Sequence, residues 1–302
     1  MNRRHALKLA ATLPLAATAL PTFAAPAAPP VEPKFKVNFA PHVGTFKEHA
    51  GDDILDQIRW AADRGFTAWE DNGMPKRTPE MQKAIGELLA KKGMTMGVFV
   101  ANKINWSEPT LTQGAGRHRE EFLASTRDAV EVAKRCGAKW MTVVPGFVDL
   151  RLEPFYQFAN VLETLKQGAA ILEPHGLTMV LEPLNYRDHP GLFLTKAAQA
   201  YAMCKAVDSP ACKILFDVYH QQIQEGNLIP NIDAAWEEIA YIQLGDNPGR
   251  KEPGTGEINY RNVIKHIHGK GYSGVYGMEH GNSRDGLAGE LAVIEAYRKI
   301  DV

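Results

Sequence analysis

Four short apolar segments in the second half of the chain each end at a polar residue with a metal-binding oxygen. The segments are 178–181, 213–216, 240–242 and 275–278, and they lead into Glu182, Asp217, Gln243 and Glu279. Short apolar runs of this kind are typical of strands buried on both faces in a parallel sheet. A polar residue directly after such a strand indicates a site at the carboxyl edge of the sheet, where α/β barrels carry their chemistry.

Predicted strands and helices alternate along the rest of the chain. Four earlier strands are expected at 36–40, 67–70, 94–100 and 140–144. Helices are expected at 52–64, 78–92, 117–135, 152–173, 195–207, 232–239, 260–269 and 287–300. Strict alternation predicts an α/β fold, a (β/α)₈ TIM barrel in a single domain. An open doubly wound sheet would need a glycine-rich dinucleotide turn after an early strand, and the sequence has none.

The first residues are predicted to lie outside this barrel. Arg3 and Arg4 precede an apolar run at 6–20, and the residues 22–24 have the small-x-small pattern of a signal-peptidase site. We expect a twin-arginine signal peptide at 1–24, an Ala/Pro-rich linker at 25–34 and the barrel at 35–302. The protein is therefore expected to be exported, to the periplasm. An ordinary secretory signal or an uncleaved anchor is the alternative, although the apolar run is too short for a stable membrane span.

Composition narrows the class of partner. The chain of 302 residues has 34 Lys and Arg against 35 Asp and Glu, and it is 45% hydrophobic. This is the balance of an ordinary globular protein without the basic footprint of a nucleic-acid binder, so the expected partner is a small-molecule substrate. The sequence leaves open whether the protein forms a homo-oligomer. The three cysteines have no C-x-x-C spacing, which leaves a Cys204–Cys212 disulfide open as well.

The residues that follow the four apolar segments indicate a metal site. Three carboxylates and one amide supply oxygen donors, which suit Mg²⁺ or Mn²⁺ better than zinc, whose usual ligands are His and Cys. One such residue alone is as well explained by a loop cap, but four at matching strand ends favour a site. His42 and Glu70 also stand at predicted strand ends. For these two, placement on the surface is an equal alternative.

Three stretches in this half of the chain carry more specific motifs. They are the segments LEPLN at 181–185, FDVYH at 216–220 and DNPGRKEPGTGEINY at 246–260. Together they resemble the hydroxypyruvate isomerase family, which belongs to the xylose-isomerase-like barrels. The resemblance implies that the metal ligands are Glu182, Asp217, Gln243 and Glu279. It also implies that Glu182 and Glu279 transfer protons, that His220 contacts the substrate, and that Arg250 anchors a substrate carboxylate.

The first half departs from that family in the long loop at 101–116. The family's usual Gly-Asp-Trp and Gly-Glu-Arg-Gly patterns are replaced by KINW at 103–106 and GAGR at 114–117. A polar loop of this length is usually a lid or a binding segment. The departure affects the expected substrate more than the expected chemistry.

The implied activity is an aldose–ketose type of intramolecular oxidoreduction, which interconverts hydroxypyruvate and 2-hydroxy-3-oxopropanoate. A divalent cation would stabilise the enediolate oxygens, and two carboxylates on opposite sides would remove and return the proton. A ketose epimerase with the same metal and glutamates is one alternative, and a non-catalytic exported sugar-binding barrel is another. Related epimerases generally have His as the third ligand, so Gln243 favours the isomerase. The presence of all four ligands argues against a non-catalytic barrel.

Overall fold

The computed structural model describes residues 32–302. The chain divides into two units, Met1–Pro30 and Val31–Val302, and the account below concerns the second unit. The predicted signal peptide and almost all of the predicted linker lie outside the described residues. The boundaries at 24 and 34 therefore stay predictions.

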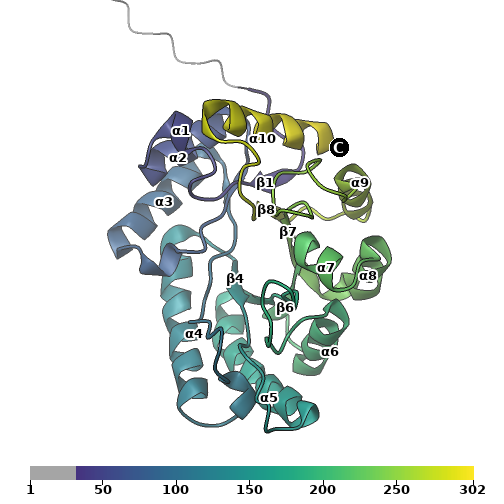
Figure 1. The fold of residues 1–302 in the computed structure, drawn as a ribbon. Helices are drawn as coiled ribbons and strands as arrows, with labels where there is room; N and C mark the ends of the chain where they lie inside the picture. Colours follow the sequence, from purple (N-terminus) through teal and green to yellow (C-terminus); the bar gives the residue numbers. More distant parts are fainter. Residues whose placement is uncertain (1–31) are drawn as a thin grey trace, which may run out of the picture. The chain divides into compact units, whose positions relative to one another are not determined.

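A curled parallel sheet of six strands forms the centre of the second unit, in the order β1-β8-β7-β6-β5-β4 (Figure 1). Its strands are β1 (Asn38–Ala40), β4 (Trp140–Val143), β5 (Thr178–Leu181), β6 (Cys212–Asp217), β7 (Ile239–Leu244) and β8 (Val275–Met278). The remaining strands, β2 (Ala68–Trp69) and β3 (Thr95–Met96), form a separate parallel pair. This arrangement confirms a TIM-barrel-like α/β fold.

Isolated parallel bridges connect the two sheets. His42, just after β1, pairs with Glu70, just after β2, and Val100, beyond β3, pairs with Thr142 in β4. The backbone N–H of Thr142 also donates to the carbonyl of Phe99 at 2.8 Å. The two short strands thus bridge the edges of the six-stranded sheet, with far fewer ladder hydrogen bonds than the other strands have.

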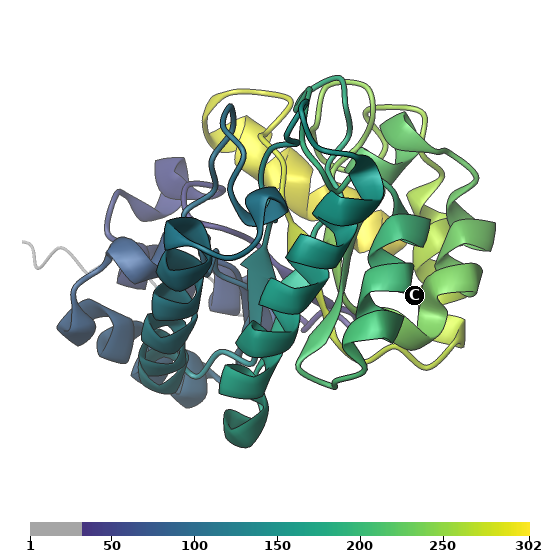
Figure 2. The ribbon, with the colours of Figure 1, turned by 90° about the horizontal axis from the view of Figure 1, so that it is seen from below.

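Helices cover the outside of the strands (Figure 1, Figure 2). They are α1 (Lys47–Ala50), α2 (Ile54–Asp63), α3 (Pro79–Lys92), α4 (Arg117–Cys136), α5 (Pro154–Leu172), α6 (Ala197–Val207), α7 (Val218–Gln224), α8 (Leu228–Ala235), α9 (Tyr260–Gly269) and α10 (Gly286–Ile300). The start of α3 follows from its sequence, because the side chain of Thr78 accepts from the N–H of Met81 and Pro79 occupies the first turn. Among residues 32–302, no helix combines the length and apolarity that crossing a bilayer requires.

The observed helices differ from the predicted helices at three places. The sequence did not indicate α1 or α7, and the helix expected at 232–239 ends earlier, where α8 passes into a 3₁₀ turn at Trp236–Glu238. Helix α7 has seven residues, too few to show a helical period. It starts because the Asp217 side chain accepts from the N–H groups of Tyr219 and His220, which fixes the first turn.

Most of the apolar core lies in two layers. The larger lies between the sheet and the helices. The smaller fills the interior of the barrel and comprises Ala40, Ala68, Val98, Val180, Leu215, Tyr241 and Val275. Small residues from β1 and β2 leave room there for the ring of Tyr241, whose hydroxyl accepts from the N–H of Val98 at 3.3 Å. The interior is therefore a packed apolar core, as in other α/β barrels.

The three cysteines, Cys136, Cys204 and Cys212, are free thiols and all are buried. The disulfide between Cys204 and Cys212 that the sequence left open is therefore not formed. In these positions the cysteines act as small apolar residues of the core.

Candidate metal centre

The carboxyl ends of β5 to β8 bring the four predicted ligands to one rim of the sheet. In the parallel register Asp217 pairs with Gln243, and Gln243 pairs with Gly277. Glu182 and Glu279 come directly after the last residues of β5 and β8. The strand ends thus set the relative positions of the four side chains, as expected for a barrel site.

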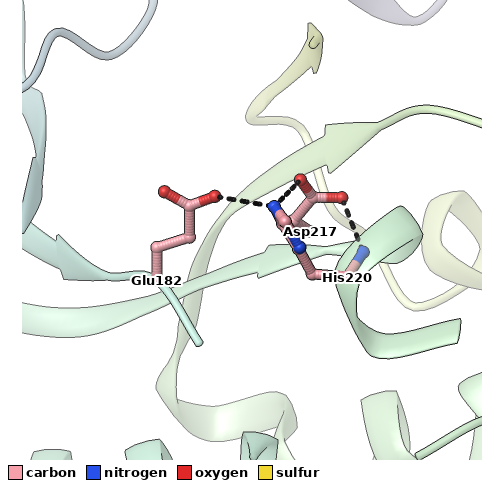
Figure 3. A group of neighbouring side chains, drawn as sticks. All are labelled: Glu182, Asp217 and His220. Carbon is pink, nitrogen blue, oxygen red and sulfur yellow. Dashed lines mark hydrogen bonds and ion pairs between the residues drawn. The ribbon is translucent and has the colours of Figure 1, made fainter. Parts of the chain in front are cut away.

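Glu182, Asp217 and His220 form a group of neighbouring side chains at this rim that could hold a metal ion (Figure 3). One potential ligand atom from each lies within 4.8 Å of the other two. His220 Nε2 is 3.8 Å from Glu182 Oε1 and 3.6 Å from Asp217 Oδ2. All three residues are buried, and by position they could hold a metal ion.

The hydrogen bonds of His220 decide what its Nε2 can do. Its Nδ1 lies 2.7 Å from Asn185 Nδ2 and accepts from the Asn185 backbone N–H at 3.3 Å. The orientation of that amide is fixed, because Asn185 Oδ1 accepts from the N–H groups of Arg187 and Asp188. Burial lowers the pKa of His220 to about 4, so the ring is neutral near pH 7. A neutral ring whose Nδ1 accepts carries its proton on Nε2 and donates from there.

Arg250 lies among the carboxylates of the site. Its Nη2 is 2.7 Å from Glu279 Oε2 and 3.3 Å from Asp217 Oδ2, and its Nε donates to the Glu279 carbonyl at 3.1 Å. Glu279 is not part of the group formed by Glu182, Asp217 and His220. The guanidinium group of Arg250 links it to Asp217. Its other oxygen, Oε1, accepts from Asn72 Nδ2 at 3.0 Å. Arg250, which was predicted to anchor a substrate carboxylate, thus already hydrogen-bonds to two carboxylates of the protein.

Gln243 offers one free oxygen. Its Nε2 donates to Glu70 Oε1 at 2.7 Å, whereas its Oε1 is buried without a hydrogen-bond partner. Glu70 also accepts from the hydroxyl of Tyr241 at 2.9 Å. Glu70 is fully buried, so the surface placement that the sequence left open for it is wrong. Burial raises the pKa of Glu70 to about 8, and the charge of Glu279 adds to the shift.

The electrostatics of the rim favour a bound cation. Burial raises the pKa of Glu182 well above its usual value, and the negative charges of Glu279 and Asp217 add to this effect. Burial also raises the pKa of Glu279, while Arg250 opposes the shift. Carboxylates crowded in a buried site resist ionisation unless a positive charge compensates them. The oxygen donors and the unpaired amide oxygen of Gln243 therefore fit a hard divalent cation.

Several residues near the site were not predicted from the sequence. Asn72 supports Glu279, and Asn185 orients His220. The ring of His189 lies 5.5 Å from that of His220, and Trp106 of the long loop stacks on His189 at 5.0 Å between centroids. The sequence marked Trp106 through the long polar loop and Asn185 through the LEPLN motif, whereas nothing marked His189 or Asn72.

His42 is turned towards the backbone. Its Nδ1 is 2.8 Å from the Val43 carbonyl, and its Nε2 is 3.0 Å from the His280 carbonyl. Neither ring nitrogen contacts the carboxylates of the rim. These contacts do not support a role for His42 at the proposed metal site.

Comparison with known proteins gives one consistent family. The family model described as "Xylose isomerase-like TIM barrel" matches residues 58–299. A Cupriavidus necator protein named 2-oxo-tetronate isomerase is 31% identical over 270 residues, 88% of this chain and 98% of that protein. The Escherichia coli protein named hydroxypyruvate isomerase is 33% identical over 179 residues, 59% of this chain and 69% of that protein.

Solved structures match the same fold. A crystal structure described as an AP endonuclease of family 2 from Brucella melitensis has a TM-score of 0.73 and 25% sequence identity. The match covers 86% of this chain and 99% of that chain. The similarity therefore extends over nearly all of the described residues.

Proposed function

The chain belongs to the xylose isomerase-like TIM barrel family, and we propose that it is a metal-dependent isomerase of short hydroxy keto acids. The proposed reaction interconverts hydroxypyruvate and 2-hydroxy-3-oxopropanoate, an aldose–ketose type of isomerisation. The relatives named hydroxypyruvate isomerase and 2-oxo-tetronate isomerase support this substrate class. The arrangement of the rim supports the chemistry.

The observation that carries the proposal is the buried, unpaired Oε1 of Gln243 beside Asp217. A buried acceptor without a donor costs about 1–3 kcal/mol, a cost that a ligated cation removes. We assign the ligands as Glu182, Asp217, Gln243 and Glu279, and the ion as Mg²⁺ or Mn²⁺. His220 is the competing third ligand, but its Nδ1 faces two N–H donors, which keeps the proton on Nε2.

The two glutamates supply the proton transfer. They follow β5 and β8, which are separated in the sheet by β6 and β7, so they approach a substrate from different sides. One carboxylate removes a proton from C3 of hydroxypyruvate, and the other delivers a proton to C2 of the enediolate. The proton of the C3 hydroxyl passes to the C2 oxygen, which leaves an aldehyde at C3 and a hydroxyl at C2. When bound, the cation supplies Lewis-acid stabilisation of the charge on the substrate oxygens.

His220 and Arg250 complete the site as substrate-binding residues. The Nε2 proton of His220 faces the space between Glu182 and Asp217, where it can donate to a substrate oxygen. Arg250 holds Glu279 and Asp217 through Nη2. Its Nη1 group supplies further N–H donors for a substrate carboxylate, a pairing that the planar guanidinium favours.

The test is to measure isomerisation of hydroxypyruvate before and after chelation, with Mg²⁺ or Mn²⁺ added back. We expect chelation to abolish turnover and either ion to restore it, and we expect Asp217→Asn to resist restoration. Full activity in excess chelator would contradict the proposal. Parallel assays with ketoses separate the alternatives. C3 epimerisation without hydroxypyruvate turnover indicates an epimerase, and binding without turnover indicates a non-catalytic barrel.

We also propose that the protein is exported by the twin-arginine route, on the basis of the sequence at Arg3 and Arg4. Replacing both arginines by lysine should retain the protein in the cytoplasm, which cell fractionation measures. Unchanged export of that variant would favour an ordinary secretory signal.

A further inference from the structure

We propose that Glu70 is a positioning residue that fixes which end of the Gln243 amide faces the metal site. The inference rests on the proposed function, because it takes Gln243 as a ligand. Glu70 follows β2, in the part of the barrel that supplies none of the proposed ligands. Its carboxylate nevertheless reaches β7, where it contacts Tyr241 and Gln243.

The hydrogen bonds around Glu70 determine the orientation of the amide. Glu70 Oε1 accepts from Gln243 Nε2 at 2.7 Å, and Glu70 Oε2 accepts from the Tyr241 hydroxyl at 2.9 Å. That hydroxyl accepts from the N–H of Val98, so its own proton is free to point at Glu70. Both oxygens of Glu70 accept in these two hydrogen bonds, and an accepting oxygen draws the NH₂ end of the amide. The Oε1 atom of Gln243 must then face away from Glu70. This oxygen is buried and has no hydrogen-bond partner.

The backbone of β8 leaves room for this contact. Gly277 pairs with Gln243 in the register of the two strands. A Cβ atom at Gly277 would overlap Glu70 Oε2 and would lie 3.0 Å from Gln243 Cγ. The missing side chain at this position thus lets Glu70 lie against Gln243.

A buried carboxyl in a barrel interior needs a physical reason. Burying a carboxyl group is unfavourable unless its hydrogen bonds compensate, whereas an apolar side chain of similar volume would pack without that cost. Glu70 is fully buried beside the apolar interior layer that contains Tyr241. Holding the amide oxygen of a ligand towards a cation is such a reason. Metal ligands in proteins are commonly oriented by partners of this kind.

The experiment is a double-mutant cycle on metal affinity. Mn²⁺ binding is measured by titration calorimetry on the chelator-treated full-length protein as wild type, Glu70→Gln, Gln243→Ala and the double variant. A glutamine at position 70 that accepts from Tyr241 presents its NH₂ group to Gln243, which turns the amide of Gln243 around. We expect Glu70→Gln to weaken binding about 10–100-fold. In the Gln243→Ala background we expect no further loss, because residues that act through one another are not additive.

Tyr241→Phe is the matched control. It removes the other hydrogen bond to Glu70 and leaves the bond to Gln243 in place, so the loss of affinity should be smaller than for Glu70→Gln. Thermal unfolding of the metal-free variants monitors the fold. If Glu70→Gln fails to fold, Glu70→Asp replaces it, because the shorter side chain keeps the carboxyl group and no longer reaches Gln243.

The outcomes separate the positioning role from the proposed function. Wild-type affinity in the folded position-70 variant overturns the role of Glu70. An equal loss in both backgrounds overturns it too, since Glu70 would then act through its charge or through the fold. In both cases the wild type still binds Mn²⁺ and the proposed function stands. A wild type that binds no divalent ion contradicts the proposed function itself.

Discussion

The two halves of the barrel differ in how they contribute to the site. Strands β5 to β8 have four to six residues each, pair in parallel, and carry the four proposed ligands at or next to their carboxyl ends. In the first half β4 also has four residues, but β1 has three, and β2 and β3 have two each. The first half instead supplies Glu70 and Asn72, which hydrogen-bond to Gln243 and Glu279. The comparison teaches that the longer strands place the proposed ligands, and that side chains from the first half hydrogen-bond to two of them.

The largest effect is expected for Glu279→Gln in the second half. An amide cannot accept the proton, so kcat should fall about 10²–10⁴-fold while the fold is retained. Steady-state kinetics with hydroxypyruvate measure the loss, and circular dichroism monitors the fold. The exposed Glu295→Gln serves as the matched control and should be neutral. Near-normal turnover by Glu279→Gln would remove Glu279 from proton transfer.

Arg250→Ala should mainly raise KM for acidic substrates. A charge-assisted hydrogen bond is worth about 1.5–3 kcal/mol, which corresponds to a change in KM of roughly 10–150-fold. Arg250 also holds Glu279 and Asp217, so kcat should fall to some extent as well. Arg250→Lys keeps the charge and separates the two contributions. An unchanged KM in Arg250→Ala would show that the substrate carboxylate binds elsewhere.

Gly277→Ala tests whether the Glu70 side chain of the first half lies against β8 of the second half. The added Cβ overlaps Glu70, so we expect destabilisation of about 1–3 kcal/mol, as for overpacking in a core. Thermal and denaturant unfolding of the metal-free protein measure this. Gly269→Ala is the control, since a Cβ there meets no atom within 4 Å. Equal stability of the two variants would mean that Glu70 does not lie against β8.

Asn72→Ala should have the smallest effect. It removes one hydrogen bond to Glu279 Oε1, and a hydrogen bond to a charged group contributes about 1.5 kcal/mol or more, roughly tenfold in kcat/KM. The exposed Asn262→Ala is the matched control. If Asn72→Ala lowered activity as strongly as Glu279→Gln, the division between ligand and supporting residues would be wrong.

Local patterns account for what the sequence predicted correctly. The helix expected at 260–269 coincides with α9, and each predicted ligand stands at or just beyond the end of an apolar run that proved to be a strand. The spacing of apolar residues and the length of an apolar run depend only on residues that are close in the sequence. They can therefore be recognised without knowledge of the fold. The rim follows from them, because parallel strands end at one edge.

Contacts between distant segments account for what was missed. Glu70 and Gln243 are 173 positions apart, and Asn72 and Glu279 are 207 apart, so no local pattern could pair them. Helix α7 was missed for another reason. Its start depends on the side chain of Asp217, which was interpreted only as a ligand.

The most direct test of the proposed metal centre is a crystal structure of the protein with Mn²⁺, with the ion located by its anomalous scattering. We predict one peak per chain, coordinated by Glu182, Asp217, Glu279 and the Oε1 atom of Gln243, with His220 Nε2 outside the coordination sphere. Absence of a peak at this rim, or a peak ligated by His220 Nε2 in place of Gln243, would contradict the assignment.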